Sequence, residues 1–239
     1  NVFGVNSQAL EWRSEPVGGP FYALAHGDVD ADGNAELLDV VYSYSAMLTI
    51  RDGATKNIEY RGPSATSNWL DVLGLAHGNL DDDPQSEILV GTGQTYSGEL
   101  ACFDGVTHLE QWRTRFPSGL LIASTTVADV DLDGDMEVIV GSYGEHTGAP
   151  NGYVYVLNGR TGAIEWRSPS VGGTFTRVEL LRVGNIDSDP QPEILAGTGS
   201  RTWILDAVNG SASVFNTPLT ALELSDIDRN GQLDIVGGT

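Results

Sequence analysis

Five short segments of the chain carry oxygen-bearing side chains at one shared spacing. Counted from the first residue of each segment, these oxygens stand at positions 1, 3, 5 and 9, with glycine or proline at position 6. A hard cation such as Ca²⁺ takes about six to eight oxygen ligands, and acids spaced two apart curl around it where a turn residue bends the chain. The sequence therefore predicts up to five Ca²⁺ sites. The predicted side-chain ligands are Asp28, Asp30, Asp32 and Glu36 in loop one, Asn79, Asp81, Asp83 and Glu87 in loop two, Asp129, Asp131, Asp133 and Glu137 in loop three, Asn185, Asp187, Asp189 and Glu193 in loop four, and Asp226, Asp228, Asn230 and Asp234 in loop five; the position-7 carbonyls of Asn34, Gln85, Asp135, Gln191 and Gln232 complete the shells.

Two other interpretations of these loops are weaker. The EF-hand loop begins with the same triplet, but its bidentate acid stands at position 12, between two helices. Here position 12 is Asp39, Val90, Val140, Ala196 or Gly237, and strand-forming runs follow every loop. A metal-free hairpin would hold several carboxylates close together, where like charges repel.

Acidic residues dominate the charge of the chain. Its 239 residues include 33 Asp and Glu against 12 Lys and Arg, a formal net charge of −21. Five bound Ca²⁺ would add ten charges and leave about −11, which still argues against nucleic-acid partners. No apolar run is long enough to span a membrane, and the first residues lack a targeting pattern. We expect a soluble segment of a longer protein, without membrane insertion and monomeric when isolated.

The loops mark an internal repeat. They begin at residues 28, 79, 129, 185 and 226, and self-similarity at a few tens of residues is typical of propellers and solenoids. In the third repeat we expect strands at 138–141, 153–157 and 163–167, and a further strand at 176–181 before the next loop. Such a unit is a four-stranded antiparallel blade, and no stretch shows helical periodicity.

The two ends of the chain predict how the blades are closed. The C-terminus stops two strands into a fifth blade, while 2–5 and 9–14 resemble the third and fourth strands of a blade. Joining them would hide strand edges that otherwise invite aggregation. We therefore predict one all-β domain, 1–239, folded as a five-bladed propeller with a Ca²⁺ loop in each blade and a ring closed by two strands from each terminus.

The pattern Asp-x-Asp-x-Asp-Gly-x-x-Glu followed by Val/Ile-Val-Gly resembles the calcium-binding repeat of integrin alpha-subunit propellers, the FG-GAP or VCBS repeat. The turn and strand at 157–166 are also similar to the repeats of quinoprotein-like propellers, in which the aromatic residue packs between blades. Loops two and four depart from the first pattern, with Asn at position 1 and Pro84 or Pro190 at position 6, and loop five carries Asn230 and ends in Asp234. The resemblance implies weaker Ca²⁺ binding at these loops, most clearly at loop five.

Aromatic and histidine side chains are the other candidates for chemistry. One aromatic residue recurs in each blade, and packing between twisted sheets explains the series Trp12, Tyr60, Trp112, Trp166 and Phe215. Trp69 and Trp203 lie outside it and are freer to make surface contacts. His26 and His77 occupy equivalent positions before loops one and two, which indicates a structural role, and no zinc spacing or catalytic triad accompanies them or His108.

These features predict a non-catalytic, calcium-stabilised recognition or adhesion module of an extracellular or cell-surface protein. Glycan binding, or a module like those of polysaccharide lyases, is the alternative; it needs a basic residue and aromatics on one face. A quinoprotein-type oxidoreductase would need more blades and cofactor ligands, and a surface-layer component stays open. Loop lengths vary most on the face opposite the calcium loops, where 62–69, 91–98, 141–152, 168–174 and 197–201 emerge. There we expect a protein or glycan ligand to contact Trp69, Tyr96, Tyr143 and His146.

Overall fold

All regular structure in the described residues is β-strand. The computed structural model describes residues 1–16, 21–41, 47–62, 74–94, 97–117, 119–144, 152–215 and 217–239. Within these ranges no helix is long and apolar enough to cross a membrane. The prediction of an all-β chain is confirmed.

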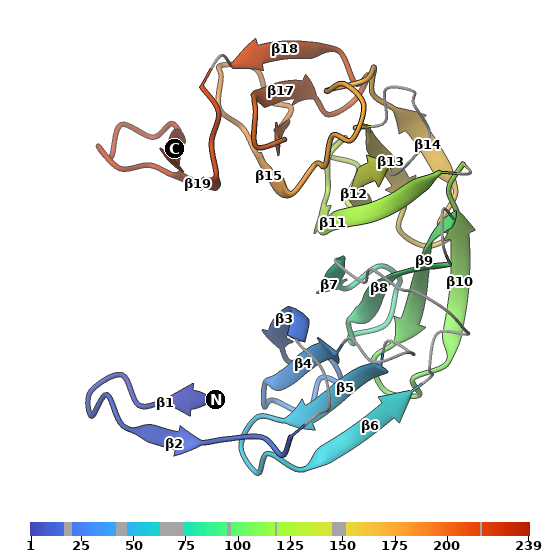
Figure 1. The fold of residues 1–239 in the computed structure, drawn as a ribbon, viewed down its shortest axis with the longest axis vertical. Coiled ribbons are helices and arrows are strands. Elements are labelled where there is room, and N and C mark those ends of the chain that lie inside the picture. The colour runs from blue at the N-terminus through green and yellow to red at the C-terminus, as the bar shows by residue number, and fades with distance from the viewer. Residues whose placement is uncertain are drawn as a thin grey trace.

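Four four-stranded antiparallel sheets follow one another along the chain, each with its strands in sequence order (Figure 1). Their strands are β3 (Phe21–Gly27), β4 (Glu36–Val41), β5 (Met47–Asp52) and β6 (Ile58–Gly62) in blade one; β7 (Leu75–Gly78), β8 (Glu87–Gln94), β9 (Ser97–Asp104) and β10 (Glu110–Arg115) in blade two; β11 (Leu120–Ala128), β12 (Glu137–Gly144), β13 (Val154–Asn158) and β14 (Ile164–Arg167) in blade three; and β15 (Leu180–Gly184), β16 (Glu193–Gly197), β17 (Thr202–Asp206) and β18 (Ala212–Phe215) in blade four. Every acidic loop joins a first strand to a second strand, so these loops share one face. Among the described residues, the turn between β16 and β17 and the connection from β14 to β15 leave from the opposite ends of their strands, on the face that we call calcium-free.

The strand predicted at 176–181 lies slightly later in the chain. The first strand of blade four is β15, Leu180–Gly184, because it pairs with β16 up to the start of the acidic loop, with Gly184 opposite Glu193. Pairing across the sheet, rather than the local run of apolar residues, sets where this strand begins.

The predicted closing blade is not formed. β1 (Val2–Phe3) pairs with β2 (Leu10–Trp12), and β19 (Ala221–Ser225) pairs with β20 (Asp234–Gly238), as two separate sheets. Figure 1 shows the blades along an arc, with an opening between the two pairs. Since β1 has two residues, it offers few ladder hydrogen bonds to offset the entropy lost in joining the ends.

Each terminal pair packs on its neighbouring blade instead. Glu15 forms ion pairs with Arg51, at 3.0 Å, and with Arg61, and the Arg51 guanidinium lies 5.5 Å from the centre of the Trp12 ring. At the other end, Leu222 of β19 packs in a cluster with Leu195 of blade four. The arc is thus continuous from the first pair to the last.

The hydrophobic core is divided into clusters that lie between successive blades. Ile50 and Ile88 share the first cluster, Leu100 and Leu157 the second, and Val156 with other residues of blades three and four the third. Apolar area removed from water at each contact, at roughly 25 cal/mol per Å², holds neighbouring blades together.

The aromatic series ties each blade to the next. Trp112 Nε1 donates to the Gly159 carbonyl at 2.9 Å and Trp166 Nε1 to the Ala207 carbonyl at 3.0 Å, in both cases in the third-to-fourth-strand turn of the following blade. Tyr60 stacks on His108 of blade two, with 4.3 Å between ring centres. The predicted packing role of these aromatics is confirmed.

Candidate metal centres and the calcium-free face

Two backbone turns give all five acidic loops the same inner shape. The position-3 carboxylate accepts the N–H of position 5 at 2.8 to 3.2 Å. The position-5 oxygen then accepts the N–H of position 7 at 2.7 to 2.9 Å. Because a side chain that bonds the backbone two residues on closes a local turn, the alternating acids curl the chain around their own carboxylates.

The position-9 acid closes each loop from the other end. One of its oxygens accepts the N–H of position 2 at 2.6 to 3.0 Å. The position-2 residues Val29, Leu80 and Val130 are buried between blades, which fixes their loops against the core, whereas Ile227 of loop five is 65% exposed.

Burial raises the pKa of the four position-9 glutamates. Removal from water, with a smaller contribution from the neighbouring loop carboxylates, raises the pKa of Glu87 and of Glu137 to about 7. The same causes raise the pKa of Glu36 and Glu193. A buried carboxylate whose charge is disfavoured gains strongly from a neighbouring cation.

Glycine and proline at position 6 divide the loops into two kinds. In the glycine loops, which are one, three and five, the position-6 N–H donates to the position-1 carboxylate at 2.9 to 3.1 Å. The φ angles of Gly33, Gly134 and Gly231 are +92°, +97° and +90°, a region that favours glycine.

Proline has no N–H, and the proline loops, two and four, use another bond. There the position-1 residue is asparagine, and its Nδ2 donates to the position-5 carbonyl, from Asn79 to Asp83 at 2.5 Å and likewise from Asn185 to Asp189.

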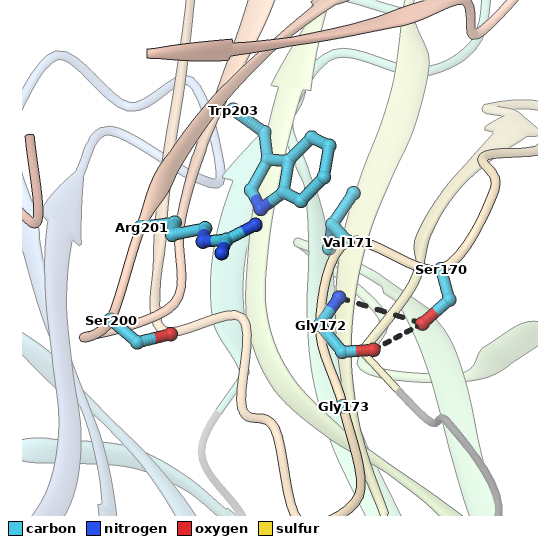
Figure 2. A pocket seen from close by; sticks show the side chains of 7 residues that line it. All are labelled: Ser170, Val171, Gly172, Gly173, Ser200, Arg201 and Trp203. Atoms are coloured by element: carbon cyan, nitrogen blue, oxygen red, sulfur yellow. Dashed lines mark hydrogen bonds between the residues drawn. The ribbon is translucent and has the colours of Figure 1, made fainter. Parts of the chain in front are cut away.

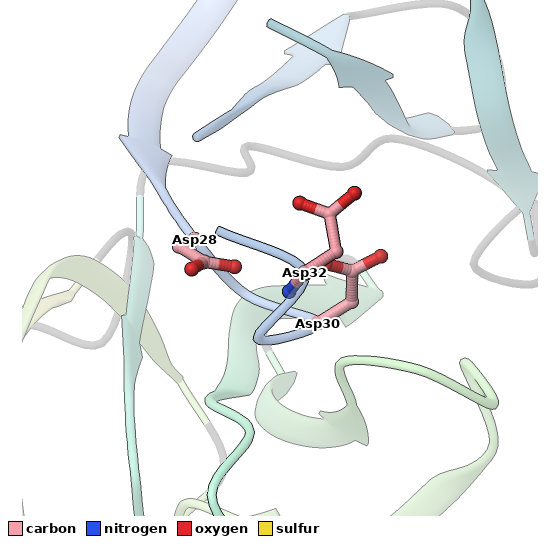
Figure 3. A group of neighbouring side chains, drawn as sticks. All are labelled: Asp28, Asp30 and Asp32. Atoms are coloured by element: carbon pink, nitrogen blue, oxygen red, sulfur yellow. Dashed lines mark hydrogen bonds between the residues drawn. The ribbon is translucent and has the colours of Figure 1, made fainter. Parts of the chain in front are cut away.

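The donor set fits a hard cation. Three acids in every loop present oxygens within 4.8 Å of one another: Asp28, Asp30 and Asp32; Asp81, Asp83 and Glu87; Asp129, Asp131 and Glu137; Asp187, Asp189 and Glu193; and Asp226, Asp228 and Asp234. Figure 3 shows the first group projecting from one loop. Glu87 Oε1 and Asp129 Oδ1 are buried and lack a hydrogen-bond partner. Coordination of a metal ion would satisfy both oxygens. Glu36 and Asp133 stand outside these groups, and ligation by the position-7 carbonyls stays a prediction.

Sequence and structure comparisons agree with this geometry. Residues 122–157, which contain loop three, match the FG-GAP repeat. A search of curated proteins finds no sequence match. The chain has an FG-GAP β-propeller-like fold.

Among solved structures, this FG-GAP-like propeller is similar to two quinohemoprotein alcohol dehydrogenases. For the enzyme from Pseudomonas putida the identity is 15% and the TM-score 0.56, and for that from Comamonas testosteroni 17% and 0.54; the match covers 84% of this chain and 36% of either enzyme. BBS1N, solved in complex with ARL6DN, gives 14% identity and a TM-score of 0.59 over 88% of this chain and 64% of its own. At these identities the likeness shows the fold alone.

On the calcium-free face of the propeller, one predicted contact residue lies in the described part. Tyr143, in β12, is half-buried, and the Arg177 guanidinium lies 4.2 Å from the centre of its ring. Trp69, Tyr96 and His146 lie outside the described residues. Tyr143 is therefore held by its own chain, and its predicted role in ligand binding is untested.

A pocket of about 640 Å³ opens on the same face and was missed as a site by the sequence reasoning (Figure 2). It lies where the connection from blade three to blade four meets the turn between β16 and β17, and its lining residues are Ser170, Val171, Gly172, Gly173, Ser200, Arg201 and Trp203. Both connections were assigned to the calcium-free face from sequence, and the place of Trp203 outside the aromatic series was the signal that could have located the pocket.

Proposed function

We propose that this chain is a calcium-stabilised, non-catalytic recognition module of an extracellular or cell-surface protein, with its binding surface on the calcium-free face. The observation that carries the proposal is the repetition of one oxygen-lined loop in all four blades and the C-terminal pair, always on the same face. Repetition at equivalent blade positions favours a structural metal, because a catalytic ion would be expected at one site beside other reactive groups.

Calcium is the favoured ion because of the ligand chemistry. Each loop offers carboxylate and backbone carbonyl oxygens, every loop except loop three adds side-chain amide oxygens, and no loop contains histidine or cysteine. Zinc favours nitrogen and sulfur ligands, while Mg²⁺ demands strict octahedral geometry and retains water. The flexible coordination of Ca²⁺ suits a curled loop that contributes many oxygens.

An extracellular location follows from the expected affinity. Extracellular modules bind Ca²⁺ with dissociation constants of about 10⁻⁴ to 10⁻³ M, matched to the calcium concentration outside cells. Loops that lack one position-1 carboxylate, as the proline loops do, suit this weaker range and would be empty in resting cytosol. FG-GAP repeats are also typical of extracellular proteins.

A glycan-binding role is the second candidate, and the pocket favours it. Arg201 and Trp203 meet there, the basic residue and aromatic that glycan recognition requires. This supports binding of a sugar ligand rather than lyase chemistry.

Thermal unfolding at controlled free Ca²⁺ tests the proposed function. Chelator-stripped protein is compared at about 10⁻⁷ M and about 10⁻³ M free Ca²⁺, with Mg²⁺ as the control ion. At about 10⁻³ M free Ca²⁺, each site with a dissociation constant of about 10⁻⁴ to 10⁻³ M adds roughly 0.4 to 1.4 kcal/mol to the free energy of unfolding. Each kcal/mol raises the melting temperature by about 2 to 4 °C in a domain of this size. Equal melting temperatures in both conditions would contradict the proposal.

A further inference from the structure

The pocket between blades three and four contains two hydrogen-bond donors that the protein does not use. Trp203 Nε1 is buried without an acceptor, whereas the N–H groups of Trp112 and Trp166 each donate to a carbonyl of the next blade. A buried N–H without a partner destabilises the folded protein, because it has lost its hydrogen bonds to water. A ligand atom that accepts from this indole would remove that cost.

Arg201 is the second donor. Seven arginines of the described residues pair with a carboxylate, and Arg201 is not among them. In a chain with 33 acidic residues, an arginine that pairs with none of them is available to bind an external anion. In the view of Figure 2 its guanidinium lies beside the Nε1 edge of Trp203.

The backbone holds these donors in place. Thr198 N–H donates to the Arg201 carbonyl at 2.9 Å, and Arg201 N–H donates to Thr198 Oγ1 at 3.3 Å, which closes the turn that carries the guanidinium. Trp203 follows directly in β17, where it pairs with Ala196 and Val214. On the opposite wall, Ser170 Oγ donates to the Gly172 carbonyl at 2.5 Å.

We propose that this pocket binds a small sugar acid, with its carboxylate held by Arg201 and the Trp203 indole N–H. This assignment rests on the proposed recognition role of the calcium-free face and names the ligand class for it. A guanidinium matches a carboxylate in charge and geometry. Val171 and the indole provide apolar wall for the ring, while Ser200 provides a hydroxyl for the sugar hydroxyls.

The charge of the protein favours a monoanion over larger anions. The protein has a formal net charge of −21, which repels every charge along a polyanion. Physiological salt screens this repulsion only at distances beyond about 8 Å. One arginine neutralises one carboxylate, and a phosphate dianion would leave a second charge unpaired. The pocket therefore matches a ligand with a single carboxylate attached to a ring.

The test is an NMR titration of Ca²⁺-saturated protein labelled with ¹⁵N-tryptophan, using sodium D-glucuronate and, as the neutral counterpart, D-glucose. The Trp203→Phe variant keeps the ring packing, assigns the Trp203 resonance and removes the donor. We expect glucuronate to shift the Trp203 indole N–H with a dissociation constant in the millimolar range, and glucose to bind at least about tenfold more weakly.

Arg201→Gln and Arg229→Gln form the matched pair. Both arginines are exposed, and Arg229 lies in loop five, on the opposite face. Arg201→Gln should weaken glucuronate binding about tenfold or more, and Arg229→Gln should leave it unchanged. Equal binding of glucose, no shift of the Trp203 resonance, or unchanged binding by Arg201→Gln would overturn the assignment. Tighter binding of a galacturonate trimer than of galacturonate itself would also overturn it, in favour of a polyanion site. Melting temperatures with and without Ca²⁺ are measured on the same samples, so failure of calcium stabilisation is seen separately.

Discussion

Loops two and three occupy equivalent positions between the first and second strands of their blades, yet different atoms close them. In loop three, Gly134 N–H donates to the Asp129 carboxylate at 3.1 Å; in loop two, Pro84 has no N–H, and Asn79 Nδ2 donates to the Asp83 carbonyl at 2.5 Å. The residue types at positions 1 and 6 therefore change together, aspartate with glycine and asparagine with proline. Compared with a glycine loop, a proline loop has lost the position-1 carboxylate and gained a rigid turn residue at position 6. The proline loops should therefore bind Ca²⁺ more weakly, because they have one charged ligand fewer, and should be better ordered without metal, because their turn is rigid.

The largest effect is expected at the buried acid of a glycine loop. Glu137→Gln keeps an acceptor for Val130 N–H but removes a ligand charge that is 3% exposed. At a free Ca²⁺ concentration of about 100 times the dissociation constant, we expect the calcium-dependent part of the free energy of unfolding to fall by about 2.7 kcal/mol, the contribution of one site. Without Ca²⁺ the variant should equal or exceed the parent in stability, because repulsion among the loop carboxylates is relieved. Denaturant unfolding with and without Ca²⁺ measures both, and a loss that is the same in both conditions would contradict the metal role.

Substitution of position 6 by alanine should cost more stability in a glycine loop than in a proline loop. Gly134 has φ of +97°, and an added Cβ would meet no atom within 4 Å, so the cost of Gly134→Ala is backbone strain of about 1 to 3 kcal/mol. Pro84→Ala should cost less than about 1 kcal/mol, since alanine adopts the proline conformation and loses only its rigidity. The measurement is the free energy of unfolding of each variant. Equal losses in the two variants would show that the glycine and proline loops do not differ in this way.

A double-mutant cycle tests the coupling between positions 1 and 6. Asn79→Asp alone loses the bond to the Asp83 carbonyl and adds a carboxylate with no N–H to accept. Pro84→Gly alone supplies the N–H without the carboxylate. Together they recreate a glycine loop, and we expect a favourable coupling of about 1 kcal/mol and tighter Ca²⁺ binding than in the parent. Additive single effects in calorimetry and denaturant unfolding would refute the coupling.

The smallest effect concerns pH. The folded protein raises the pKa of Glu87 and Glu137 from 4.5 to about 7, so the folded state without metal binds more protons than the unfolded state between these values. Their contribution to stability therefore falls as pH rises from about 4.5 to 7. Calcium competes with these protons, and its binding to loops two and three should tighten between about pH 6 and pH 8, with release of up to about one proton at each of these two loops. Calcium titrations in two buffers of different ionisation enthalpy measure that release, and Glu137→Gln should reduce it; binding without proton release would contradict the raised pKa values.

Sequence alone predicted the features that repeat locally. The Asp28 to Glu36 spacing and its four copies located every acidic loop, and the alternating strands that follow gave the four-stranded blades. The Trp112 and Trp166 positions identified the packing between blades. These patterns can be recognised in the sequence because each depends on residues close together in the chain and recurs at the same place in every repeat.

Features that depend on distant residues were not predictable in this way. The burial that raises the pKa of Glu137 depends on packing between blades. The pocket joins Val171 from one connection to Arg201 and Trp203 from another. The predicted closing blade relied on similarity of strand sequences, which says nothing about the energy of bringing β1 and β20 together.

Isothermal titration calorimetry of chelator-stripped protein with CaCl₂ tests the central claim most directly. If the five acidic loops are metal sites, the titration shows several Ca²⁺ per chain, with loops one and three filling before the proline loops and Mg²⁺ unable to replace Ca²⁺. Loss of one equivalent in Glu137→Gln would assign a site to loop three. A titration without Ca²⁺ binding, or one in which Zn²⁺ is preferred, would contradict the account.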